Sequence, residues 1–340
     1  MISRKIRFPK TIYNVLIINY SLVIILCCAV LWTVFFIIAS NILMKNISFY
    51  AEQTTRETSE KVDLALRNIE VTSRMIINNK QIADLINIKY IKLKEKSQKL
   101  DEWSEHSENL SIYEALANIS IDWNAIHSIG FYLGSDKSYY FGKIWDSSLY
   151  DFNYIKNKLK ILEGSNQVLS WTSVKRLPFS SKYIFTLVRD YVNMDSLKSI
   201  AYLVMNIDEA YIKNILRESN LGKSGVIYIL DDQGVVMSTK DRDKIEKKLE
   251  YPFVYSRDNG SFAAQIDKVP MLVAFNRSKY TRWVTVGIIP TNELSDDLFK
   301  SRRQLVLVGI IALAVSLILS VLIARRIVKP LNRLIVAMKK

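Results

Sequence analysis

Side chains that commonly perform covalent chemistry or bind metals are scarce in this sequence of 340 residues. Its two histidines are His106 and His127, and its two cysteines are the adjacent Cys27 and Cys28. A hydrolytic site needs a nucleophile and a base that are adjacent in space, and a zinc site needs several Cys or His ligands at suitable spacing. His106 lies in a charged stretch and His127 opens an apolar one. We therefore expect no catalytic site and no metal site.

The segment Asp231-Asp232-Gln233-Gly234 contains two adjacent acidic residues shortly before a glycine. It resembles a calcium-binding loop only superficially, because it lacks alternating carboxylates and a Glu further along the chain. Segments rich in Val and Ile flank it on both sides, which is typical of a β-hairpin turn. We interpret it as a turn and expect no cofactor in this chain.

Two apolar stretches, residues 13–39 and 305–324, are long enough to cross a membrane as helices, which takes about 20 residues. A cleaved signal peptide would have an apolar run of only about 7–15 residues, whereas the first stretch is longer and carries Trp32, Phe35 and Phe36 near its outer end. A buried core helix is the alternative for the second stretch, but a basic tail follows it directly. We predict two transmembrane helices.

The net charge of +14 is concentrated beside these two stretches. Residues 1–12 carry four basic side chains, residues 325–340 carry six, and neither segment has an acidic one. Cytoplasmic loops near membrane helices are enriched in Lys and Arg. We therefore predict a multi-pass plasma-membrane protein with both termini in the cytoplasm and residues 40–300 outside the cell. The basic character then reflects membrane topology and not nucleic-acid binding, because no basic stripe interleaved with aromatic residues is present.

The extracytoplasmic part begins with a helix-rich stretch. Neither Gly nor Pro occurs between Lys10 and Ile129, and apolar residues such as Val62, Leu66 and Ile69 recur at helical spacing. We predict one long helix, straight or bent, over residues 41–88 and a second helix over residues 109–119. The charged stretch between them, residues 89–108, either ends the long helix or forms an exposed connection.

From Gly130 onward, short runs rich in Val, Ile, Tyr and Phe alternate with Gly and Pro, a pattern typical of strands. The elements follow the same order twice: a hairpin, a helical segment, three strands and a closing helix. The first copy comprises residues 127–133, 138–141, 151–162, 168–174, 183–191, 199–206 and 208–219, with Asp208 as a helix cap. The second comprises residues 226–230, 235–238, 241–249, 261–266, 271–276, 282–289 and 292–303. We predict an α+β fold of two five-stranded antiparallel modules, a distal one at about 110–220 and a membrane-proximal one at about 221–292.

Three segments within this repeat resemble a known family. Residues 225–236 resemble the opening hairpin of the membrane-proximal module of double-Cache sensor domains, residues 283–290 resemble its closing strand, and residues 201–208 resemble the exit of the distal module. The resemblance covers about residues 41–300 and implies two stacked PAS-like modules behind a long N-terminal helix. It also implies that a ligand binds in the distal module, where the candidate contacts are Tyr132, Tyr140, Trp145, Trp171, Tyr183, Arg189, Asp190 and Tyr202.

The candidate contacts have the chemistry of a small-molecule pocket, which combines aromatic walls with a few polar groups. Arg189 would hold a ligand carboxylate with two parallel hydrogen bonds. The alternative for each aromatic residue is an ordinary core or surface position in a strand. The aromatic and arginine signature of amino-acid-binding double-Cache domains is not evident, which argues against an amino-acid ligand. A separate solute-binding protein that docks on the outer face is a further alternative.

The tail adds a second resemblance, because residues 325–334 are similar to the start of a HAMP linker. Pro330 would begin its helix, and Leu331 and Leu334 would fall on one face and relay the signal. A basic anchor for lipid headgroups is the alternative.

The whole layout resembles the sensing half of Gram-positive-type sensor histidine kinases. That resemblance implies a homodimeric two-component receptor whose partner is a response regulator, reached through a kinase half that this sequence does not contain. Other transmembrane signalling proteins with the same outer domain are the first alternative, among them methyl-accepting chemoreceptors, cyclases and membrane-bound regulators. A non-signalling envelope protein or an enzyme on the outer face is the second.

Overall fold

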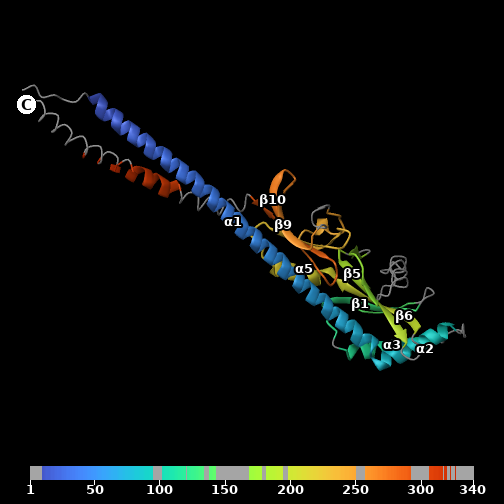
Figure 1. Cartoon of the computed structure of the whole chain (residues 1–340). Helices are drawn as coiled ribbons and strands as arrows, with labels where there is room; N and C mark the ends of the chain where they lie inside the picture. Colours follow the sequence, from blue (N-terminus) through green and yellow to red (C-terminus); the bar gives the residue numbers. More distant parts are fainter. Residues whose placement is uncertain are drawn as a thin grey trace, which may run out of the picture. The chain divides into compact units, whose positions relative to one another are not determined.

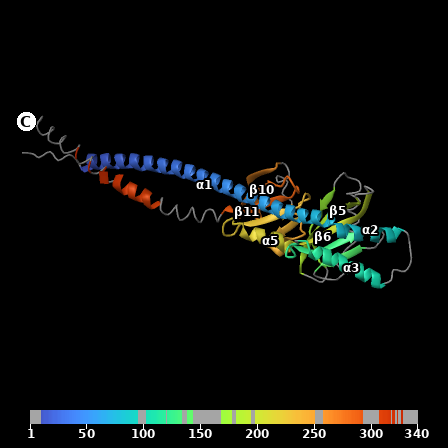
Figure 2. The same cartoon turned by 90° about the horizontal axis from the view of Figure 1, so that it is seen from below.

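Figures 1 and 2 show the computed structural model of the chain. It describes the backbone of residues 10–94, 102–119, 121–133, 138–142, 168–177, 181–193, 198–249, 257–291 and 306–316, with isolated positions up to 326. The chain divides into two compact units. Residues 50–290 form the first, which we call the sheet unit, and residues 1–49 with 291–340 form the second, which we call the apolar unit.

Helix α1 (Lys10–Ile77) begins in the apolar unit. From Leu22 onward it is long and apolar enough to cross a membrane, and its most apolar window is not buried. A shorter apolar helix, Val306–Ser316, packs against it, since a β-carbon at Gly309 would lie 3.6 Å from the Trp32 ring. The first predicted span is therefore part of a longer helix. The second predicted span, residues 305–324, extends beyond the described helix and stays a prediction.

Helix α1 ends in the sheet unit at Ile77. Asn79 then caps α2 (Lys80–Lys94), because its Oδ1 accepts a hydrogen bond from the Ile82 N–H at 3.1 Å. Asparagine side chains satisfy free N–H groups at helix starts, so the single helix predicted for residues 41–88 is interrupted here. The stretch predicted to end the long helix or to form a connection, residues 89–108, contributes the end of α2 and the start of α3 (Glu102–Ala117).

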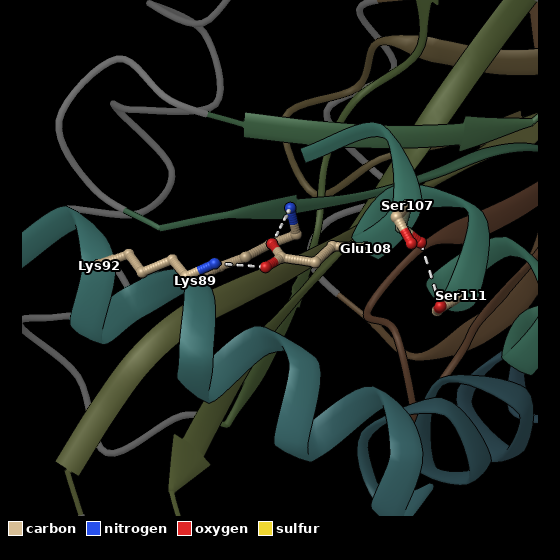
Figure 3. A network of polar contacts seen from close by, with 5 residues as sticks. All are labelled: Lys89, Lys92, Ser107, Glu108 and Ser111. Atoms are coloured by element: carbon tan, nitrogen blue, oxygen red, sulfur yellow. Dashed lines mark hydrogen bonds and ion pairs between the residues drawn. The ribbon is translucent and has the colours of Figure 1, made fainter. Parts of the chain in front are cut away.

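An ion-pair cluster joins α2 to α3, as Figure 3 shows. Lys89 is only 2% exposed and places its Nζ 3.3 Å from Glu108 Oε2, while Lys92 donates a hydrogen bond to Glu108 Oε1 at 2.5 Å. Burial acts to raise the pKa of Glu108, but the hydrogen bonds and charges of the two lysines outweigh it, so the pKa is lowered. We call this cluster the lysine clasp. Beside it, Ser111 donates to the Ser107 carbonyl at 3.1 Å.

The first sheet, the distal sheet, has the strand order β2-β1-β6-β5-β3, and the short β4 pairs with β5. Neighbouring strands are antiparallel. The strands are β1 (Ile126–Tyr132), β2 (Ser138–Gly142), β3 (Leu169–Trp171), β4 (Lys175–Arg176), β5 (Tyr183–Asn193) and β6 (Lys198–Asp208). Each has a predicted counterpart except β4.

The second sheet, the proximal sheet, repeats this order as β8-β7-β11-β10-β9. Its strands are β7 (Val226–Leu230), β8 (Val236–Thr239), β9 (Asn259–Ile266), β10 (Val269–Arg277) and β11 (Val284–Pro290). The predicted repeat of two antiparallel modules is thus confirmed, with β4 as an additional sixth strand in the distal sheet. Helix α5 (Glu209–Glu218) connects the sheets, and its predicted cap is present, since Asp208 accepts a hydrogen bond from the Ala210 N–H at 2.9 Å.

The helix predicted for residues 241–249 is wrong. A single turn of 3-10 helix, η2 (Arg242–Lys244), forms there, and the chain then pairs with the proximal sheet, where Lys248 bridges Val235. The Val236 N–H also bonds to the Lys247 carbonyl at 2.9 Å, so backbone pairing replaces the helix. The helices predicted for residues 151–162 and 292–303 lie outside the described residues.

One face of each sheet packs on α1, which runs along both sheets in Figures 1 and 2. In the proximal sheet, a β-carbon at Gly287 of β11 would fall 2.8 Å from Thr55 of α1 and 2.7 Å from Leu221, so the backbone approaches the helix too closely for a side chain. In the distal sheet, Arg189 of β5 donates a hydrogen bond to Ser73 of α1 at 2.9 Å. The α1 positions predicted from helical spacing are buried: Val62, Leu66 and Ile69.

Candidate functional site

The face of the distal sheet that points away from α1 brings together several of the predicted contacts. Strand pairing places Tyr202 of β6 directly beside Tyr132 of β1 and, on its other side, beside Asp190 of β5. Directly paired residues of antiparallel strands project from the same face of a sheet. Tyr132, Tyr202 and Asp190 therefore share one face, which we call the tyrosine face.

The tyrosine face has a small apolar centre. Tyr132, Val188 and Val204 are buried and form a cluster, and the half-buried Tyr202 packs against it. At the edge of the cluster, Ser199 donates a hydrogen bond to the Asp190 carboxylate at 2.5 Å. Aromatic and aliphatic surface beside an oriented carboxylate is a combination typical of small-molecule sites.

A buried row of polar side chains continues the tyrosine face, and we call it the polar row. Thr186 donates to Asn206 Oδ1 at 2.7 Å, and Asn206 Nδ2 donates to Ser128 Oγ at 3.0 Å. Thr186 and Ser128 each pair directly with Asn206 in the sheet. Buried polar groups are costly unless they are hydrogen-bonded, so these contacts fix the row in place. Sequence reasoning missed the row, although the signal was present, since each residue lies at an even spacing from a predicted contact on its own strand.

The corresponding face of the proximal sheet has a different chemistry. Its buried cluster is apolar and consists of Leu230, Val236, Val273, Phe275, Val284, Val286 and Ile288. Tyr228 and Met271 are among the partly buried residues that pack against this cluster. Such a face stabilises its module but offers a ligand few hydrogen-bonding groups.

Arg189 lies on the other face of the distal sheet, because consecutive strand residues point to opposite faces. Its Nη1 donates to Ser73 Oγ of α1 and lies 3.7 Å from Glu70 Oε1. Burial lowers the pKa of this guanidinium, although Glu70 opposes the shift. The structure therefore does not bring Arg189 to the tyrosine face. Its guanidinium, which was predicted to bind a ligand carboxylate, contacts Ser73 and Glu70 of α1 instead.

Trp171 and Tyr183 are on the same face as Arg189 by strand alternation. Trp171 packs between the two sheets, with its ring centroid 5.9 Å from that of Phe185 and 6.2 Å from that of Trp283. Tyr183 begins β5 and pairs with β4. Neither residue reaches the tyrosine face.

Several predicted residues lie outside what the structure describes. The backbone of Tyr140 pairs with Gly130 of β1, but its side chain is not among those described. Trp145 and the predicted relay residues Pro330, Leu331 and Leu334 also lie outside the described residues. Their roles stay predictions.

Residues with catalytic or metal-binding potential are scattered over the described part of the chain. His127 is buried in β1, His106 is exposed on α3, and Cys27 and Cys28 are free thiols in α1. Among the residues that the structure describes, no group of three or more His, Cys, Asp or Glu side chains is arranged to hold a metal ion. The tyrosine face is therefore the candidate site that the geometry offers.

No protein-family model matches the sequence. A curated relative, a probable methyl-accepting chemotaxis protein of Bacillus thuringiensis, is 30% identical over 135 residues. The match covers 38% of this chain and 20% of the relative, so the chain spans about a fifth of that protein's length.

Solved structures share the fold. The ligand-binding domain of the Pseudomonas fluorescens chemoreceptor CtaA, in complex with L-isoleucine, has a TM-score of 0.53 at 12% identity, over 75% of this chain and 97% of that one. The ligand-binding domain of the Campylobacter jejuni chemoreceptor Tlp3, in complex with L-valine, has a TM-score of 0.52 at 14% identity over the same shares. The periplasmic sensory domain of Campylobacter jejuni Tlp1 has a TM-score of 0.52 at 13% identity, over 74% of this chain and 97% of that one. A long N-terminal helix with two antiparallel sheets is thus the fold of chemoreceptor ligand-binding domains.

Proposed function

We propose that this chain is the sensing part of a transmembrane signal receptor and that its distal module binds a small molecule outside the cell. The observation that carries the proposal is the tyrosine face, where Tyr132 and Tyr202 lie beside Asp190 and the polar row. The proximal module, whose corresponding face is apolar, serves transmission in this proposal. The fold shared with chemoreceptor ligand-binding domains supports it.

The chemistry of the tyrosine face favours a ligand with an ammonium or hydroxyl group. Asp190 supplies a carboxylate, the two tyrosines supply aromatic surface and the polar row supplies hydroxyl and amide groups. A cation is stabilised beside a carboxylate and an aromatic ring. L-isoleucine and L-valine, which are bound in two structural neighbours, carry such an ammonium group. Amino acids therefore belong among the candidates with amines and polyols, although the sequence lacks the expected signature.

Calorimetric titration of the full chain in lipid nanodiscs tests the binding proposal with a panel of amines, polyols, amino acids and carboxylic acids. We expect one class to bind and Asp190→Asn to weaken its binding by about tenfold or more, since a hydrogen bond to a charged group contributes about 1.5–3 kcal/mol. Asp232→Asn, in the exposed turn of the proximal hairpin, is the matched control. Absence of heat from every panel member, together with binding of a solute-binding protein, would replace this proposal with the docked partner.

We also propose the predicted topology, with spans at residues 13–39 and 305–324 and both termini in the cytoplasm. The exposed apolar surface of α1 and the contact between Trp32 and Gly309 support a pair of membrane helices. The signal would leave through the second span and the tail residues Pro330, Leu331 and Leu334. A membrane-impermeant thiol reagent on intact cells should label Lys240→Cys but not Lys5→Cys, and the reverse pattern would contradict the topology.

We further propose a homodimer joined along α1. Leu64, Val71 and Met75 are 61%, 39% and 50% exposed, and with Asn68 they follow spacings of four and three residues. That spacing forms a coiled-coil seam, and a single Asn in such a seam favours one register of two parallel strands. In a background in which Cys27→Ser and Cys28→Ser remove the native thiols of α1, oxidation of Val71→Cys should yield a disulfide-linked dimer, whereas Arg217→Cys on α5 should stay monomeric. Equal dimer yields would contradict the seam.

Two output classes fit this sensing part. The resemblance of the tail to a HAMP linker favours a sensor histidine kinase that acts on a response regulator, whereas the 30% identical relative is a probable methyl-accepting chemotaxis protein. Sequencing the gene past the codon for Lys340 separates the two classes. A phospho-accepting histidine helix with an ATP-binding domain would support the kinase, and a long methylatable coiled coil would support the chemoreceptor.

A further inference from the structure

A single carboxylate on α1 contacts both modules of the sheet unit. Glu70 Oε1 lies 3.7 Å from Nη1 of Arg189, on β5 of the distal sheet. Glu70 Oε2 accepts a hydrogen bond from the hydroxyl of Tyr280, in the connection between β10 and β11 of the proximal sheet. One side chain therefore joins the long helix to each of the two sheets.

The Arg189 side of this bridge is buried. Arg189 is 7% exposed, and Ser73, which accepts a hydrogen bond from its Nη1, is fully buried. A guanidinium group stays charged in proteins, so this buried cation needs an anion nearby, and Glu70 provides it.

The contact between Arg189 and Glu70 is incompletely formed. The distance of 3.7 Å between Nη1 and Oε1 exceeds that of a charge-assisted hydrogen bond, which is about 2.7–2.9 Å. The Arg189 Nε has no hydrogen-bond partner among the residues that the structure describes. The contact can therefore tighten or open when β5 shifts by a small distance.

The Tyr280 side is held by further contacts with α1. The Arg67 guanidinium lies 4.7 Å from the centroid of the Tyr280 ring. Ser278 accepts a hydrogen bond from the Tyr280 N–H at 3.0 Å and its hydroxyl lies 2.7 and 2.8 Å from the two carboxylate oxygens of Asp63. Asp63 and Glu70 are about two helical turns apart, so two points on α1 hold the connection that leads into β11.

Strand β5 links the bridge with the tyrosine face. Val188 and Asp190 flank Arg189 in sequence and project to the tyrosine face, whereas Arg189 projects to α1. Because β5 pairs with strands on both sides, a ligand that displaces Val188 or Asp190 also displaces Arg189. In the proximal module, the Tyr280 connection leads through β11 to Pro290, the last residue of the sheet unit.

We infer that Glu70 is the coupling residue that transmits a shift of β5 to the proximal module. The inference rests on the proposed binding of a ligand at the tyrosine face. A ligand there changes the contact between Arg189 and Glu70, and the connection into β11 responds because the same carboxylate holds Tyr280. Coupling free energy is reciprocal between two sites, so a change at Tyr280 must also alter β5.

Hydrogen exchange of the full chain in lipid nanodiscs, read by mass spectrometry, measures this coupling in both directions without a ligand. Tyr280→Phe removes only the hydroxyl that bonds to Glu70 and should raise the exchange rates of β5 amides at residues 187–190 by about threefold or more. Arg189→Met removes the guanidinium and should raise exchange at residues 278–284 by a similar factor. Glu70→Gln should raise both.

Glu108→Gln is the matched control, because it also removes a carboxylate that pairs with a buried cation in the sheet unit. It should leave exchange in both segments unchanged. Exchange that changes only in the module carrying the substitution, for Tyr280→Phe and for Arg189→Met alike, would overturn the inference. If Arg189→Met fails to fold, Tyr280→Phe still decides the question, since it keeps the aromatic ring and its contact with Arg67.

A final comparison separates this inference from the binding proposal. If no panel compound binds while the two segments exchange in a coupled way, the proposed function fails and the coupling stands. If a panel compound binds and protects residues 278–284 equally in the wild type and in Glu70→Gln, the proposed function stands and the coupling role of Glu70 is overturned.

Discussion

The distal and proximal modules share one strand order, but the faces that point away from α1 differ. The proximal face is a continuous apolar cluster that includes Phe275 and Val286. The distal face has a smaller apolar centre and a row of buried hydrogen bonds through Asn206. Apolar burial stabilises a fold by about 25 cal/mol per Å², whereas a neutral hydrogen bond contributes only about 1 kcal/mol net. The proximal face therefore contributes mainly apolar burial, whereas the distal face keeps hydrogen-bonding groups, as the proposed binding of a ligand there requires.

The largest loss of stability is expected from a substitution in the apolar cluster of the proximal sheet. Phe275→Ala should lower the free energy of unfolding by about 3–5 kcal/mol, because removal of a buried ring leaves a cavity. Tyr202→Ala on the tyrosine face should cost less, about 1–2 kcal/mol, because Tyr202 is only half-buried. Urea denaturation of the two variants gives both values, and equal losses would contradict the proposed division between the modules.

Stability should also be sensitive to an added side chain at the close contact between β11 and α1. Gly287→Ala should lower the free energy of unfolding by about 1–3 kcal/mol, because the new methyl group would meet Leu221 and Thr55. The atom of Thr55 involved is its methyl carbon, so adding Thr55→Ser should recover part of the loss. Urea denaturation of the single and double variants measures this, and strictly additive losses would remove the steric explanation.

The polar row gives a smaller effect on stability. Asn206→Ala should cost about 1–2 kcal/mol, since it leaves the buried hydroxyls of Thr186 and Ser128 without their amide partner. Asn259→Ala, at an exposed position of β9, should stay within about 0.5 kcal/mol of the wild type. Thermal denaturation compares the two, and an equally small loss for Asn206→Ala would show that the row is not fixed by these bonds.

The smallest expected effect is on the way in which stability depends on pH. The folded-state pKa of Glu108 is lowered from the ordinary value of 4.5, so the contribution of the lysine clasp is fully present above that pH and is lost as pH falls through the lower, folded-state pKa. Below pH 4.5 the wild type should therefore lose up to about 1 kcal/mol more stability than Glu108→Gln. Denaturation series across this range test the prediction, and parallel curves would contradict it.

Local patterns in the sequence predicted the strands of both modules, except β4, and the cap at Asp208, because turns, alternation and capping are properties of neighbouring residues. The same patterns marked residues 241–249 as helical, and there pairing with β8 prevailed. The break at Asn79 also carries a local signal, since its side chain caps α2.

The candidate site was only partly predictable. Arg189 and Asp190 cannot serve one face, because they are adjacent in a strand, and alternation alone would have separated them. Which of the two faces α1 covers is a different matter. It depends on long-range contacts such as that between Arg189 and Ser73, which are 116 positions apart, and no local pattern encodes such a pairing.

Paired tyrosine substitutions test the central claim most directly. Tyr202 and Tyr228 are both partly buried on corresponding faces of the two sheets. Titration of each variant in nanodiscs, with the panel compound that binds the wild type, should show binding weakened by about tenfold or more in Tyr202→Ala and unchanged in Tyr228→Ala. Retained binding in Tyr202→Ala with loss in Tyr228→Ala would contradict the assignment of recognition to the distal module.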